Sequence, residues 1–251
     1  MQGHGKYTLG NRIGGSTHRT TFVATDNEGN RVAVRVFTGS LGSSDDKWRR
    51  LLVSIMALHH PNILRLIDFR VQPDGVPYEV MELADPTRTL AGKRRLTVPE
   101  CQRVAVGVCD ALQHAHSREL VHRNLKPSNV FFDQDTVKVS DFWYGANHIV
   151  DLTHCQQLFA VPTYFSPEQC MGKPLTPATD VYSLACVLYE ALTGDPPFYS
   201  KDPIETASMH LKREPNSVGN KDLDAFFAVA LAKEPRDRFS TQQFKAALSA
   251  I

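Results

Sequence analysis

Four blocks of the sequence gather side chains that can carry charge or exchange hydrogen bonds. They are residues 32–35, 121–132, 139–143 and 161–168, which read VAVR, VHRNLKPSNVFF, VSDFW and VPTYFSPE. The second block sets cationic arginine and lysine beside two neutral asparagine amides, and the third contains the carboxylate of Asp141. The chemistry of this chain therefore depends on which fold brings the four blocks together.

A metal centre built from cysteine and histidine is one alternative. The 5 cysteines are scattered, odd in number and include no CxxC pair. His154 and Cys155 with Cys170 come nearest to a cluster, but no pair of ligands has the close spacing of a structural zinc site. We expect free thiols in a reducing compartment and no zinc.

The first third of the chain reads mainly as β-strands, with one helix between the third and the fourth of them. In residues 31–37, Arg35 shares a face with Ala33 because side chains alternate along a strand. A cap and an acidic first turn at residues 43–46 predict a helix that ends before Pro61. Strand-forming side chains separated by turn residues predict strands over residues 7–9, 21–24, 31–37, 64–71 and 77–83.

The remainder of the chain shows helical periodicity. Apolar side chains recur at helical spacing over residues 104–115, 181–192 and 223–231. A strand-rich part followed by a helical part is an α+β pattern, with the change near residues 84–86.

Composition narrows the classes of partner. The chain has 251 residues and a formal net charge of +1, so a nucleic acid held by bulk positive charge is not expected. No apolar run approaches 18 residues, so we expect no membrane-spanning segment. Residues 1–6 lack the apolar stretch of a signal peptide, which favours a cytoplasmic location.

In order and spacing, the four blocks and residues 179–184 resemble those of the eukaryotic-like (Hanks-type) serine/threonine protein kinases. The resemblance covers the chain from Tyr7 to beyond Arg238. It implies a bilobal kinase fold in a single domain over residues 1–251, with an N-lobe over about 6–83, a hinge over about 82–86 and a C-lobe over about 87–251. The short connections are similar to those of bacterial members, which are often cytosolic domains of larger proteins.

The family positions nucleotide phosphates with a strand lysine that a helix glutamate holds. The resemblance places Arg35 at the lysine and Leu51 at the glutamate. Arg35 keeps the positive charge, but its planar fork is not equivalent to an ammonium group. No carboxylate is left at Leu51 to hold this cation.

The catalytic loop departs from the family in the same way. Asn124 stands in place of the catalytic aspartate, and a neutral amide cannot take a proton from a hydroxyl. Lys126 is retained, and so are Asn129 and Asp141, the two magnesium ligands by resemblance. Trp143 replaces the glycine of the DFG motif.

The expected nucleotide site is degraded at its phosphate loop. Gly14 keeps the first glycine of the family pattern, whereas Ser16 and Arg19 take the second and third positions and Thr21 replaces the adenine-covering valine. The resemblance assigns the adenine site and hinge to Ala33, Met81, Glu82, Ala84 and Phe131. We expect binding of ATP and magnesium to be weak or absent.

The residues that hold the family's scaffold together are retained. Glu168 and Arg238 match an ion pair that anchors the activation segment, and Asp180 matches the aspartate that braces the catalytic loop. The hydrophobic column that links the two lobes would consist of Ile55, Leu66, His122 and Phe142.

These substitutions predict a pseudokinase, a kinase-like domain with impaired catalysis that acts as a regulatory, scaffolding or binding module. Two alternatives stay open: an atypical, slow serine/threonine kinase that uses Arg35, Lys126 and Asp141, and an active kinase inactivated by engineering at positions 35 and 124. The expected partner is a protein, such as a component of kinase signalling. It would dock on residues 141–168, where Thr153 is a candidate phosphoacceptor, or on residues 204–211.

Overall fold

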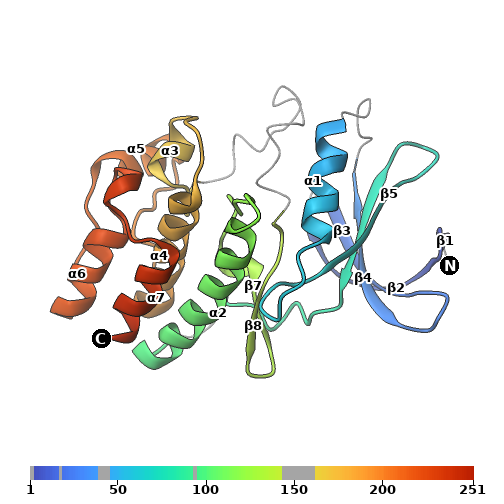
Figure 1. Ribbon diagram of the computed structural model, residues 1–251, viewed down its shortest axis with the longest axis horizontal. Coiled ribbons are helices and arrows are strands. Elements are labelled where there is room, and N and C mark those ends of the chain that lie inside the picture. Colours follow the sequence, from blue (N-terminus) through green and yellow to red (C-terminus); the bar gives the residue numbers. More distant parts are fainter. Residues whose placement is uncertain (1–2, 17–18, 39–45, 93–94, 143–161) are drawn as a thin grey trace.

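The computed structural model describes residues 3–16, 19–38, 46–92, 95–142 and 162–251. A β-sheet forms one part and a group of helices the other, and a single connecting segment joins them (Figure 1). The α+β, bilobal kinase-like architecture predicted from the sequence is confirmed. The exact boundaries of the lobes stay a prediction.

The sheet has six strands in the order β1-β2-β3-β4-β6-β5, all antiparallel to their neighbours. One face of the sheet is closed by Tyr7, Val34, Tyr78 and Val80, which are all buried in one apolar cluster. The strands are β1 (Gly3–His4), β2 (Tyr7–Ser16), β3 (Arg19–Thr25), β4 (Arg31–Phe37), β5 (Leu66–Val71) and β6 (Pro77–Glu82). The expected strands are confirmed, and β2 extends past the predicted residues 7–9 into the phosphate-loop hairpin.

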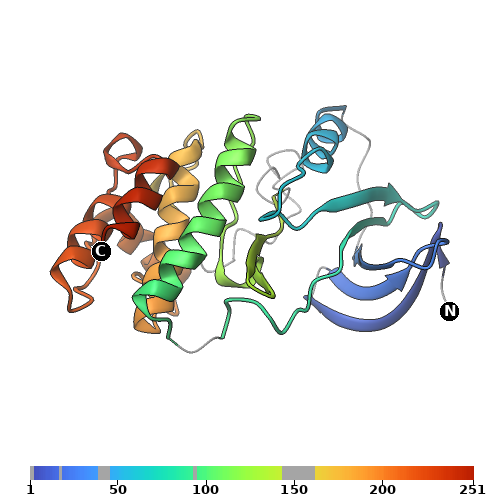
Figure 2. The ribbon, with the colours of Figure 1, turned by 60° about the horizontal axis from the view of Figure 1, so that its bottom comes forward.

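Helix α1 (Asp46–Met56) lies beside β5, between the sheet and the helical part (Figure 2). It buries Leu52 and Ile55 on the side facing the main core, while Val53 is exposed. This periodicity matches the helix predicted from the sequence, whose expected cap at residues 43–45 lies outside the described residues. Its position brings α1 next to the cleft between the two parts.

The helical part is built around α2 (Val98–His116), which packs against α4 (Pro177–Thr193) and α7 (Thr241–Ser249). A capping box between Thr97 and Glu100 begins α2, and a left-handed Gly194 ends α4. The other helices are α3 (Pro167–Cys170), α5 (Pro203–Lys212) and α6 (Lys221–Ala230).

A short hairpin of β7 (Val130–Asp133) and β8 (Thr136–Val139) lies between helix α2 and the sheet (Figure 1). The connecting segment is bonded to β7, because Leu90 N–H donates to the Val130 carbonyl and Phe132 N–H donates to the Arg88 carbonyl. On its other side the hairpin meets α2 so closely that a Cβ on Gly107 would lie 2.8 Å from the Cβ of Val137. The hairpin therefore fixes the segments that flank it, residues 122–129 and 140–142, against the helical part.

Candidate functional site

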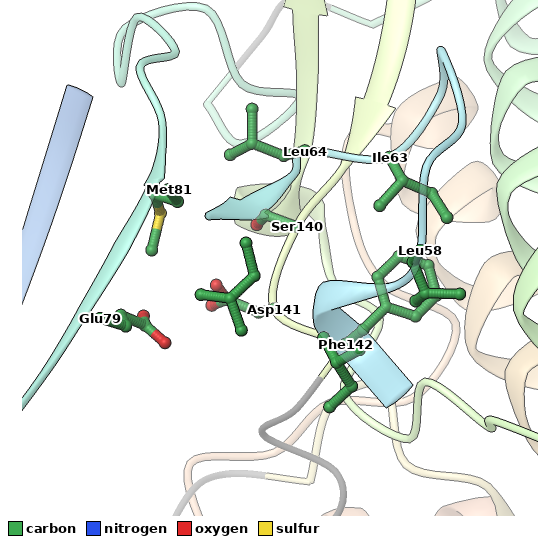
Figure 3. A pocket seen from close by; sticks show the side chains of 10 residues that line it. Leu58, Ile63, Leu64, Glu79, Met81, Ser140, Asp141 and Phe142 are labelled. Carbon is green, nitrogen blue, oxygen red and sulfur yellow. The ribbon is translucent and has the colours of Figure 1, made fainter. Parts of the chain in front are cut away.

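Three of the four chemistry-bearing blocks contact one another between the sheet and the helical part: residues 32–35, 121–132 and 139–142. A pocket there is lined by Glu79 and Met81 on one side and by the apolar side chains of Leu58, Ile63 and Phe142 on the other, with Asp141 between them (Figure 3). Asp141 follows strand β8, whereas Glu79 and Met81 lie on β6. Residues far apart in the sequence thus converge on one buried site.

Arg35 has two carboxylate partners at the centre of this site. Its Nη1 forms a very short contact with Glu79 Oε1 and donates to Asp141 Oδ1 at 2.8 Å. Glu79 is fully buried and Arg35 is only 8% exposed. Helix α1 has Leu51 where the family has a glutamate, and strand β6 supplies a carboxylate to Arg35 instead. The family motif does not include this position, so the resemblance could not reveal it, although a glutamate within the apolar strand PYEVME is a visible signal.

The two carboxylates respond differently to this environment. Burial would raise the pKa of Asp141, but the guanidinium groups of Arg35 and Arg19 outweigh burial and hold that pKa at about 2. Complete burial raises the pKa of Glu79 above its usual value, and Arg35 opposes part of that rise. Asp141 is thus ionised throughout the physiological pH range.

Arg19, at the start of β3, reaches across the cleft to Asp141. Its Nη1 and Nη2 both lie 3.3 Å from Asp141 Oδ2. Arg19 pairs with Ser16 across the hairpin, and Gly14 pairs with Thr21. In this structure the two oxygens of Asp141 therefore contact two different arginines.

The conformationally demanding glycine of this hairpin is Gly15. It has φ of +153°, and a Cβ there would lie 2.6 Å from the Arg19 carbonyl oxygen, whereas a Cβ on Gly14 would meet nothing within 4 Å. The family pattern pointed to Gly14 and Ser16 but not to Gly15. Only glycine fits the conformation that turns the chain toward Arg19.

Asp180 holds the catalytic loop in place, as the resemblance implies. Its carboxylate accepts hydrogen bonds from the N–H groups of His122 and Arg123 at 2.8 and 2.7 Å and lies 2.7 Å from His116 Nε2. Arg123 has φ of +65°, an unfavourable conformation that these contacts offset. The loop therefore keeps its shape although Asn124 has replaced its aspartate.

Asn124 and Asn129 are adjacent in this loop. The Asn129 side-chain amide donates to the Asn124 carbonyl at 2.9 Å, and the Asn124 N–H donates to His122 Nδ1 at 3.2 Å. Lys126 is half-buried, and burial lowers its pKa while Asp141 opposes that effect. Position 124 of the loop thus has an amide and no carboxylate, while the cation of Lys126 lies close enough to Asp141 for their charges to interact.

Asn129 and Asp141 provide the oxygen ligands that magnesium prefers. Asn129 is buried and oriented by its bond to the Asn124 carbonyl, and Asp141 is ionised. These residues fit a magnesium ion, provided that an arginine gives up its contact with Asp141. No cluster of three His, Cys, Asp or Glu side chains that could hold a metal occurs among the described residues.

The predicted adenine site forms one apolar cluster. Ala33 and Met81 are paired across β4 and β6 and are buried together with Leu64, and Ala84 and Phe131 pack against them. Leu64 was missed, as were Ile13 and Leu83 at the edge of the cluster. Glu82 instead forms an ion pair with Lys138. Its backbone N–H donates to the Arg65 carbonyl. This predicted hinge residue is therefore the last residue of strand β6, and its N–H is already hydrogen-bonded.

The predicted scaffold contacts are confirmed. Arg238 Nη1 and Nη2 donate to the two oxygens of Glu168 at 2.8 Å, with the pair buried. Ile55, Leu66 and Phe142 belong to the main core, and the ring of Phe142 lies edge-on to His122 with centroids 4.5 Å apart. Trp143, Thr153, His154, Cys155 and Val161 lie outside the described residues. Among those described, Cys101, Cys109, Cys170 and Cys186 are free thiols.

A two-part fold with this cleft defines a kinase-like class, and comparisons with known proteins agree. The protein kinase domain family model matches residues 7–248. The chain is 34% identical over 257 residues to the serine/threonine-protein kinase PknB of Mycobacterium leprae, covering 94% of this chain and 41% of that protein. A probable serine/threonine-protein kinase of Corynebacterium efficiens is also 34% identical, with 94% and 39% covered.

The chain therefore belongs to the Hanks-type serine/threonine protein kinase family and has bacterial, PknB-like relatives. The crystal structure of a point mutant of the Mycobacterium tuberculosis PknI kinase domain shares the fold, with a TM-score of 0.76 at 23% identity over 98% of this chain and 95% of that one. The chain spans about two fifths of the length of the curated relatives. No helix among the described residues is long and apolar enough to cross a membrane.

Proposed function

We propose that this chain is an atypical protein kinase domain that binds ATP in the cleft and transfers its phosphoryl group slowly to serine or threonine. The observation that carries the proposal is the buried group of Arg35, Glu79 and Asp141, which keeps a cation beside a carboxylate where the family places nucleotide phosphates. Its family normally uses ATP and magnesium. The names of the relatives, all serine/threonine protein kinases, support the same activity.

Each residue of the site has a role in this proposal. Arg35 and Lys126 bind phosphate oxygens, and Arg19 leaves Asp141 to bind them as well. Asn129 and Asp141 would hold magnesium, which neutralises phosphate charge when bound. Asn124 can orient the substrate hydroxyl by a hydrogen bond but cannot take its proton, so the transfer step is slow.

Restoring the carboxylate is the direct test. Asn124→Asp should raise kcat by about a hundredfold or more, because a general base contributes at least that much, with little change in the affinity for ATP. Asp141→Ala should abolish the activity of both forms, and Ser128→Ala, an exposed neighbour in the loop, should leave it unchanged. Phosphate transfer to a peptide mixture, measured at high enzyme concentration, checks these outcomes.

A second candidate function is a binding module without catalysis, the pseudokinase of the sequence analysis. Asn124 favours it, and so does the contact of both arginines with Asp141, which competes with magnesium. An exposed surface supports it as well, because Ile204 on α5 is 80% exposed and Tyr199 before it is 55% exposed. That surface overlaps the predicted docking residues 204–211.

The two candidates differ in measurable ways. No magnesium-dependent turnover from the natural sequence, together with a rise in melting temperature on adding ATP, would favour the binding module. The engineered-mutant alternative makes a third prediction, that Arg35→Lys with Asn124→Asp restores full activity. Glu79 argues against that alternative, because a buried glutamate that pairs with position 35 indicates that the surroundings of Arg35 have diverged too.

A further inference from the structure

The carboxylate that holds Arg35 does not come from the helix on which the family pattern places it. In α1 the position expected to hold a glutamate is Leu51, and the only carboxylate of this helix is Asp46 at its first residue. Leu51 packs against the main apolar core. Besides Asp141, the carboxylate in contact with Arg35 is Glu79, which comes from strand β6.

Arg35 and Glu79 are direct partners in the sheet. They face each other in the register of β4 and β6, between the pairs Val34–Val80 and Val36–Tyr78. Side chains at opposed positions of antiparallel strands lie about 5 Å apart at Cβ. The backbone hydrogen bonds of two central strands therefore fix the distance between the cation and its carboxylate.

We propose that Glu79 is the positioning residue for Arg35, and that it keeps this cation in place whatever the position of α1. The inference rests on the proposed function, because it concerns how the nucleotide phosphates are held. A carboxylate on a helix moves away when the helix moves. A carboxylate on the neighbouring strand moves only if the sheet itself breaks.

The ion pair of Arg35 and Glu79 is buried, so the loss of either partner changes the free energy of the site. Removing one partner from a buried ion pair leaves the other charge without that compensation. Without Glu79, the Arg35 guanidinium would keep its contact with Asp141. Arg35 would then follow Asp141 toward the catalytic loop rather than remain fixed to the sheet, and the phosphates would lose a preset cation.

A mutant cycle on nucleotide affinity tests the positioning role. We expect Glu79→Gln to weaken ATP binding, measured by calorimetry, by about tenfold or more, because the buried ion pair of Arg35 is reduced to a hydrogen bond with a neutral amide. Arg35→Met should weaken it at least as much. The double variant Arg35→Met/Glu79→Gln should bind ATP no more weakly than Arg35→Met alone, because Glu79 acts through Arg35. A purely structural role would instead give additive losses.

Control variants show whether a loss of ATP affinity comes from the location of Glu79, from removing any carboxylate of the sheet, or from a failure to fold. Asp68→Asn removes a carboxylate that is ion-paired with Arg70 in the same sheet, and it should leave ATP affinity unchanged. If Glu79→Gln does not fold, the double variant Arg35→Met/Glu79→Met can be used instead. Its ATP affinity, compared with that of Arg35→Met, still shows whether Glu79 acts through Arg35. Equal ATP affinity in Glu79→Gln and the natural sequence would overturn the positioning role.

The independence from α1 has its own test. Leu51→Ala should change ATP affinity by less than about twofold, and Leu51→Glu should not restore the affinity of Glu79→Gln. Restoration by Leu51→Glu would mean that the helix can hold the cation, which overturns the proposed independence. Absence of ATP binding by the natural sequence would overturn the proposed function and this inference together. Intact binding with an additive cycle would overturn the inference alone.

Discussion

At the scale of single residues, two substitutions act on this site in opposite directions. Asn124 removes the group that would accept a proton, whereas Glu79 supplies a carboxylate beside the phosphate-binding cation. The first change was visible in the sequence because it falls inside a motif of fixed spacing. The glutamate itself stands out in an apolar strand, but its pairing with Arg35 was not visible, because no family motif includes position 79 and its partner is 44 residues away.

Gly15 allows a prediction at the same scale. Gly15→Ala should lower the free energy of unfolding by about 1–3 kcal/mol, because its backbone conformation is unfavourable for any residue with a Cβ and the Arg19 carbonyl is in the way. It should also displace Arg19 and alter ATP affinity. Denaturant unfolding and calorimetry measure both effects.

Gly14→Ala is the matched control, because a Cβ at that position meets no neighbour within 4 Å. It should stay within about 0.5 kcal/mol of the natural sequence. Equal effects of the two substitutions would mean that Gly15 does not set the shape of the hairpin.

At the scale of elements, the helices and strands followed from the sequence more readily than their contacts. The alternation around Arg35 and the helical stripes over residues 104–115 and 181–192 predicted elements that the structure confirms. The pairing of Arg35 with Glu79 depends on the register between β4 and β6. A register is set by packing across the whole sheet, so local patterns could not reveal it.

Helix α5 contains a buried histidine with a consequence for acid stability. Burial and the nearby Lys233 lower the pKa of His210 from 6.5 to about 4. Tyr182 Oη lies 3.0 Å from its Nδ1. Between pH 6.5 and 4 the unfolded chain binds a proton at this residue that the folded chain does not, so the free energy of unfolding rises with pH over that window.

We therefore expect the melting temperature to fall as the pH is lowered from about 7 to about 5, and to fall less in His210→Asn. Asparagine can keep a polar atom near Tyr182 but does not titrate in this range. Thermal melts at half-unit pH steps provide the measurement. Parallel curves for the two proteins would show that protonation of His210 is not a source of the acid sensitivity.

At the scale of the whole molecule, the two parts are joined by one column of apolar side chains. Ile55 comes from α1, Leu66 from β5 and Phe142 from the segment after β8, and all three line the pocket of the cleft. His122 extends the column into the catalytic loop through its contact with Phe142. The resemblance predicted these four residues, because the column is a property of the family fold.

Phe142→Ala should lower the free energy of unfolding by about 3–5 kcal/mol, because a buried aromatic ring is replaced by a cavity between the two parts. Phe142→Leu fills much of that space and should cost clearly less. Urea unfolding followed by circular dichroism measures the difference. Similar stability of the two variants would show that packing at this junction is not what joins the parts.

The second oxygen of Glu79 has a consequence for chemical selectivity. Within the described part of the chain, Glu79 Oε2 is buried and accepts no hydrogen bond. Glu79 lines the pocket beside Met81 (Figure 3). A small inhibitor that extends past Met81 and ends in an ammonium or amidine group would offer this oxygen a donor. Such a compound would distinguish this domain from any kinase with an apolar side chain at the position of Glu79.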